Sequence, residues 1–206
     1  MDLVIASTNF GKIQEYKNFL EPLGFSVQSL DTIGFHDPIS EEGKTYQENA
    51  LHKANVVSRF SGQLVLADDT GLEIDALNRE PGVHSARYGD AGWSESTRNS
   101  FILDKLKDIP VEQRTAQFVC AIAIVHWEKK IEHLVTGHCK GLILKDERGT
   151  KGFGYDPVFY LPDHNKTFAE LEPETKNRIS HRGKALEKAI SFLEGYQSSL
   201  DPADSK

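Results

Sequence analysis

The sequence has few cysteines, no long hydrophobic run and no excess of basic residues. Its two cysteines, Cys120 and Cys139, both fall in the central region of the chain, which is predicted to be β-rich. Two thiols in such positions argue against a disulfide framework and favour a reducing compartment, with each thiol buried as a small hydrophobic group.

The first residues lack the features of a targeting segment. Residues 1–6 contain no basic side chain, and their apolar run is too short for a signal peptide or a membrane span. We therefore expect a cytoplasmic protein that does not associate with membranes. The formal net charge of −7 provides no broad basic face, so we expect no binding to duplex nucleic acid.

Two common nucleotide-binding motifs are missing. A P-loop that ends at residues 43–45 requires glycine at position 38, where the sequence has Pro38. Gly152 and Gly154 are not followed by the third glycine of a dinucleotide fingerprint. Any phosphate must therefore be bound in another way, by a few fixed lysines and arginines or by a metal ion.

The 206 residues, 38% of them hydrophobic, suffice for one sizeable core. We expect a single domain over residues 1–197 and a disordered polar tail over 198–206. Apolar periodicity predicts helices over 12–20, 45–61 and 94–106 and from Ser180 onward, and strands over 3–6, 25–30, 64–67, 116–127, 130–135 and 142–145. A capping box, Thr45 with Glu48, marks the start of the second helix. The predicted fold class is α/β.

The loop between the first strand and the first helix is polar and ends in a lysine. It consists of Ser7, Thr8, Asn9, Phe10, Gly11 and Lys12. The N–H groups at a helix start carry partial positive charge and Lys12 adds a full one, so a triphosphate tail could bind here. Taken alone, the pattern favours an ordinary capped turn, because polar loops before helices are common.

Several acidic residues are candidates for a metal site: Glu41, Glu42, Asp68, Asp69 and Asp75. Magnesium is held by one or two carboxylates together with substrate phosphates. Asp68 and Asp69 follow a predicted strand, a usual place for catalytic groups in α/β proteins. Adjacent side chains point in opposite directions, so one acid should face the site while the other binds its loop or a lysine. An Asx turn at 68–71 is an equal alternative.

A glycine-rich loop over residues 149–157 contains Phe153 and Tyr155. Aromatic rings are unusual in such a loop unless they cover a flat ligand, and a purine would fit. The alternative is a β-hairpin filled by its own aromatic rings.

Two further groups have ordinary explanations as well. Lys176, His181 and Arg182 gather hydrogen-bond donors near the last helix, yet alone they are typical of a solvated basic patch. His133, His138 and Cys139 lack the fourth ligand of a closed zinc site, so we interpret them as ordinary strand residues.

Six segments in this order resemble the inosine triphosphate pyrophosphatase family, also called the Ham1 family. They are residues 7–12, 41–50 with 53–54, 67–72, 81–88, 152–159 and 180–182. The resemblance implies an elongated single-domain α/β fold with a long, mixed, twisted sheet flanked by helices, two lobes around a central cleft, and a homodimer. It also implies hydrolysis of ITP, dITP or XTP to the monophosphate and pyrophosphate.

The resemblance assigns roles to individual residues. It implies that Glu41 and Asp69 bind Mg²⁺ and that Asp69 accepts the proton of the attacking water. The implied substrate-binding residues are Ser7, Thr8, Asn9, Phe10, Gly11, Lys12, Thr70, Phe153, Gly154, Tyr155, Asp156, Lys176, His181 and Arg182. Glu42, where many relatives have threonine, leaves the metal ligand ambiguous by one residue. Because a cation lowers the pKa of a carboxylate, a hydroxide held by the ion is an alternative proton acceptor to Asp69.

Base selectivity follows from hydrogen-bond donors. Lys176 and Arg182 suit the O6 acceptor of hypoxanthine and xanthine, whereas adenine presents an amino donor there. Guanine also has O6, so its exclusion requires a wall against its 2-amino group, which no residue identifies.

Two other functions remain as alternatives. A Maf-type pyrophosphatase for pyrimidine or modified nucleotides would share the first loop, but the segments 152–156 and 180–182 argue against it. A catalytically idle nucleotide-binding module would lack metal-binding acids, whereas Glu41 and Asp69 are both present.

Overall fold

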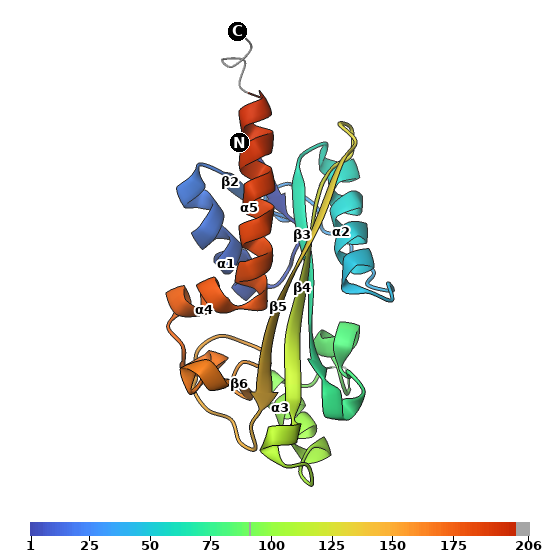
Figure 1. Cartoon of the computed structure of the whole chain (residues 1–206). Coiled ribbons are helices and arrows are strands. Elements are labelled where there is room, and N and C mark those ends of the chain that lie inside the picture. The colour runs from blue at the N-terminus through green and yellow to red at the C-terminus, as the bar shows by residue number, and fades with distance from the viewer. Residues whose placement is uncertain (91, 201–206) are drawn as a thin grey trace. The chain divides into compact units, whose positions relative to one another are not determined.

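The computed structural model describes residues 1–90 and 92–200 (Figure 1). Its strands are β1 (Asp2–Ile5), β2 (Ser26–Ser29), β3 (Val65–Ile74), β4 (Thr115–His126), β5 (Ile131–Ile143), β6 (Phe159–Leu161) and β7 (Lys166–Thr167). They form one seven-stranded sheet in the order β2-β1-β3-β4-β5-β6-β7. β1 pairs in parallel with β2 and β3, whereas β6 pairs antiparallel with β5 and β7. The predicted mixed sheet is confirmed.

The helices are α1 (Phe10–Leu20), α2 (Tyr46–Ser61), α3 (Glu95–Lys105), α4 (Pro173–Ile179) and α5 (His181–Leu200). Short 3-10 helices are η1 (Glu21–Leu23), η2 (Asp75–Leu77), η3 (Gly82–Arg87), η4 (Val111–Gln113), η5 (Pro162–His164) and η6 (Phe168–Glu170). Among the helices of the described residues, none combines the length and the apolar character that a membrane crossing requires.

Side-chain caps fix where the helices begin. The side chain of Thr45 accepts a hydrogen bond from the N–H of Glu48 at 3.1 Å, which confirms the predicted start of α2. Ser94 caps α3 in the same way, through the N–H of Thr97. Ser180 accepts from the N–H of Gly183 in the first turn of α5, as expected for its cap.

The chain folds into two compact units. The first comprises Met1–Asp69, Ala121–Thr136 and the chain from Lys184 onward. In Figure 1, α5 lies to the left of β3 and α2 to its right, so helices flank both faces of the sheet here. The apolar stripe of α5, the helix predicted from Ser180 onward, is buried at Ala185, Leu186, Ala189 and Leu193.

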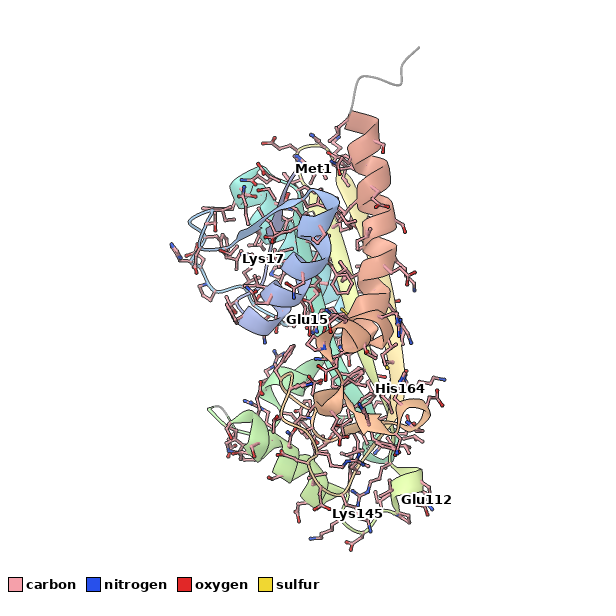
Figure 2. All side chains as sticks on the ribbon, turned by 90° about the vertical axis from the view of Figure 1, so that its left-hand side faces the viewer. Met1, Glu15, Lys17, Glu112, Lys145 and His164 are labelled. Carbon is pink, nitrogen blue, oxygen red and sulfur yellow. The ribbon has the colours of Figure 1, made fainter. Side chains whose placement is uncertain are left out.

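The second unit comprises Thr70–Cys120 and Gly137–Gly183. Its core contains three packed rings, since Phe159 lies 4.7 Å from Phe118 and 5.0 Å from Phe168 between centroids. Figure 2 labels Glu112 and Lys145 at one end of this unit and His164 farther along it; in the first unit, Glu15 and Lys17 mark α1.

Three predicted boundaries are wrong. β3 does not end before residue 68 but continues to Ile74, so neither a strand end nor an Asx turn occurs at 68–71. One continuous strand, β5, replaces the two predicted over 130–135 and 142–145. α5 extends to Leu200, so residues 198–200, predicted to be disordered, are helical. Residues 201–206 of that predicted tail lie outside the described residues.

Candidate functional site

The loop before α1 is a capped turn. Oδ1 of Asn9 accepts a hydrogen bond from the N–H of Lys12 at 3.0 Å, and Oγ of Ser7 accepts one from the N–H of Asn9 at 3.1 Å. Thr8 is exposed and the side chain of Phe10 is 74% exposed. The first N–H groups of any helix have no acceptor within it, so a capped turn can bind an anion as well.

Asp68 and Asp69 contact different partners, as their adjacency in a strand predicts. Lys12 Nζ lies 2.8 Å from Oδ2 of Asp68, whose side chain is 1% exposed. Asn49 Nδ2 donates to Oδ2 of Asp69 at 2.9 Å. These contacts allow two acids to lie inside β3, because buried carboxylates are tolerated where they are paired and hydrogen-bonded.

Lys53 on α2 lies between the two predicted metal ligands. Its ammonium group donates to Oε1 of Glu41 and lies 3.9 Å from Oδ1 of Asp69. Burial alone would lower the pKa of Lys53, but Asp68, Glu41 and Asp69 together outweigh it and raise that pKa. Burial raises the pKa of Asp69, against the opposing effects of Lys53 and Asn49.

Asn49 connects the two segments that carry Glu41 and Asp69. While its Nδ2 binds Asp69, its Oδ1 accepts a hydrogen bond from the N–H of Gly43 at 2.8 Å. A Cβ atom on Gly43 would lie 2.6 Å from that oxygen, so glycine is needed for the approach. Glu41 is half-buried against Lys53, whereas Glu42 is exposed. The geometry therefore favours Glu41 over Glu42.

The two carboxylates are suitable for a magnesium ion. In the described part of the chain, no three His, Cys, Asp or Glu side chains form a group that could hold a metal. Magnesium requires fewer, because phosphates and waters complete its oxygen shell. Glu41 and Asp69 already approach one cationic group, the Lys53 ammonium, so their oxygens fit a cation here. Thr70, next along β3, is half-buried.

In the second unit, Asp156 holds the glycine-rich loop closed. Its Oδ2 accepts hydrogen bonds from the N–H of Phe153 at 2.9 Å and from Lys176 Nζ at 2.6 Å. Gly152 and Gly154 both have left-handed φ values, +76° and +64°, which favour glycine. A side chain at Gly152 would also collide with the Asp156 carboxylate.

Two cations face the ring of Phe153. Lys176 Nζ lies 4.9 Å and Arg182 Cζ 5.5 Å from its centroid, within the range of cation–π attraction. Both cationic side chains are buried, whereas Phe153 is half-buried. Lys176 and Arg182 therefore do not form a solvated basic patch, because both are buried and lie around one aromatic ring.

Tyr155 and His181 are parts of the core of the second unit. The ring of Tyr155 packs in the core cluster, and its hydroxyl donates to the carbonyl of Ser85 at 2.8 Å. Burial raises the pKa of Tyr155 to about 12, so it remains a donor. His181 stacks on Phe118 with centroids 4.6 Å apart. The ring of Tyr155 therefore packs against protein, and its place among the substrate-binding residues stays a prediction.

Sequence reasoning missed four residues around these groups: Asn49, Lys53, Ser85 and Asn99. The first two had a signal, since they lie four residues apart in the predicted helix, on the same face as its apolar residues. Polar residues inside an apolar stripe indicate buried partners. His133, considered for zinc, stacks on Phe192 at 4.1 Å between centroids.

Comparisons with known proteins identify the family. The model of the Ham1 family matches residues 3–192. The chain is 45% identical over 193 residues to the dITP/XTP pyrophosphatases of Desulforamulus reducens and Bacillus subtilis, covering 94% of this chain and 96% and 97% of theirs.

Solved structures agree with this match. The Ham1 protein of Staphylococcus aureus has a TM-score of 0.84 at 38% identity, with 95% of this chain and 100% of that chain covered. The HAM1 protein of Coxiella burnetii has a TM-score of 0.86 at 39% identity, with 95% and 99% covered. The chain therefore belongs to the Ham1 family.

Proposed function

We propose that this chain hydrolyses the triphosphates of keto purines, ITP, dITP and XTP, to the monophosphate and pyrophosphate with the help of Mg²⁺. The observation that carries the proposal is the convergence of Glu41 and Asp69 on Lys53, next to the Lys12–Asp68 pair, in the first unit. The names of the relatives, dITP/XTP pyrophosphatase, support the choice of substrate.

Glu41 and Asp69 would hold the magnesium ion. When bound, the ion neutralises negative charge on the phosphates and on the departing pyrophosphate. Lys12 and the first N–H groups of α1 bind the phosphate tail. Asp69 accepts the proton of the attacking water. Asn49 fixes the orientation of its carboxylate.

The second unit recognises the base. Lys176 and Arg182 carry donors that match the O6 acceptor of hypoxanthine and xanthine, and the ring of Phe153 offers a surface for stacking. Asp156 holds Lys176 in place through the bond at 2.6 Å. Adenine is disfavoured because its amino group would face these donors. In this proposal the functional domain spans residues 1–197 and the enzyme is a cytoplasmic homodimer.

A substrate panel tests the proposal. Pyrophosphate release is measured from ITP, dITP, XTP, GTP and ATP, with Mg²⁺ and with a chelator in excess. We expect kcat/KM for the first three to exceed that for ATP by on the order of 100-fold or more. Equal rates on all five nucleotides, or rates that survive the chelator, would contradict the proposal.

A further inference from the structure

α3 contributes a buried asparagine to the glycine-rich loop. The side chain of Asn99 is 2% exposed, and its Nδ2 donates to the carbonyl of Gly154 at 3.2 Å. This carbonyl belongs to the residue directly after Phe153. Its hydrogen bond therefore restrains the backbone that carries the ring.

A second contact restrains the next residue of the loop. The hydroxyl of Tyr155 donates to the carbonyl of Ser85 in η3. Ser85 is itself fixed, since its Oγ accepts from the N–H of Leu72 at 2.8 Å and donates to the carbonyl of Gly82 at 2.6 Å. Gly154 and Tyr155 are thus each bound to a different segment of the second unit.

These outside contacts have a different effect from the bonds inside the loop. The bonds between Phe153 and Asp156 close the turn, and the bond between Asp156 and Lys176 ties its far end to α4. Asn99 ties the turn to α3. Oδ1 of Asn99 is buried and has no hydrogen-bond partner among the described residues.

We propose that Asn99 is a positioning residue for base selectivity, a role that rests on the function proposed above. By holding the Gly154 carbonyl, Asn99 fixes Phe153 relative to Lys176 and Arg182. A keto purine that stacks on the ring then meets the two donors at the correct place. The phosphates bind to the first unit, so turnover of a bound substrate does not depend on Asn99.

The test compares Asn99→Ala and Asn99→Ser with Ser100→Ala, an exposed control on α3. Values of kcat and KM are measured for XTP and ATP, and Kd for IMP and AMP by calorimetry. We expect Asn99→Ala to lower the XTP/ATP ratio of kcat/KM about fivefold, mainly through the KM for XTP. The Kd for IMP should rise by about the same factor. Asn99→Ser, which keeps a donor of smaller size, should give an intermediate ratio, and the control should match the wild type.

The outcomes separate this inference from the proposed function. A wild type that does not prefer XTP over ATP refutes the function. If the wild type prefers XTP, the proposed function stands. The inference about Asn99 is then refuted if the Asn99 variants lose kcat/KM equally on both nucleotides or keep the XTP/ATP ratio unchanged. If Asn99→Ala does not fold, as judged by circular dichroism, the ratio and the IMP affinity of Asn99→Ser decide.

Discussion

The two units concentrate different kinds of chemistry. In the first, carboxylates and ammonium groups alternate at short distances, with Lys12 on Asp68 and Lys53 between Glu41 and Asp69. In the second, cations face an aromatic ring and one buried carboxylate is bonded to its own loop. The lysines can bind phosphates and the carboxylates can bind a metal ion, and both ligands are common to all nucleoside triphosphates. The cations and ring suit one class of base. Changes in the first unit should therefore affect all substrates alike, and changes in the second should affect their ratio.

Both units use a buried asparagine for the same physical purpose. Asn49 bonds the Asp69 carboxylate on one side and the N–H of Gly43 on the other. Asn99 bonds the carbonyl of Gly154. A carboxamide can hold a functional group without adding a charge that would compete for the ligand. Its short side chain also loses less conformational entropy than glutamine would.

Replacing the proposed base gives the largest expected effect. Asp69→Asn should lower kcat by roughly 10²–10⁴ on XTP and ATP alike. The substitution removes the proposed proton acceptor, which does not contact the purine ring of the nucleotide. Initial rates of pyrophosphate release at saturating Mg²⁺ measure it. Asp108→Asn, at an exposed aspartate of the second unit, is the control and should retain the wild-type rate. A changed XTP/ATP ratio in Asp69→Asn would contradict the assignment of catalysis to the first unit and base selectivity to the second.

The neighbouring acids Glu41 and Glu42 offer a matched pair. Glu41→Gln should raise the Mg²⁺ concentration for half-maximal rate on the order of 100-fold, since half of the proposed carboxylate ligands is lost. Glu42→Gln should change it less than about twofold, because this exposed side chain has little effect on the site. Magnesium titrations of the rate and calorimetry without nucleotide measure the effect. Equal shifts in the two variants would remove the distinction between them.

The sequence predicts much of the fold because local signals agree with the final packing. The capping box at Thr45 and the apolar stripe of α5 each place a helix correctly. The extent of β3 could not be predicted in this way. Two aspartates and a glycine normally end a strand, and the groups that stabilise them inside β3, Lys12 and Asn49, come from distant parts of the chain.

The candidate site was also predicted only in part, because some of its residues carry a local signal and others do not. Lys12, Glu41 and Asp69 belong to residue types that suggest phosphate and metal chemistry by themselves. Asn99 carries no such signal, because a single asparagine in a helix has many ordinary explanations. Tyr155 had an ambiguous signal, since an aromatic residue among glycines can face a ligand or fill the core, and only the packing distinguishes them.

Arg182→Ala tests the proposed role of the second unit in base selectivity. Its expected effect is smaller than those of Asp69→Asn and Glu41→Gln. It removes a donor near Phe153 and should lower the XTP/ATP ratio of kcat/KM roughly tenfold. Because Lys12, Glu41 and Asp69 remain, kcat on ATP should stay close to the wild-type value. Arg178→Ala, at an exposed arginine of α4, controls for the loss of one positive charge. Equal losses on both nucleotides would mean that Arg182 stabilises the fold or binds the phosphates. Base selectivity would then have to come from Lys176 and Phe153.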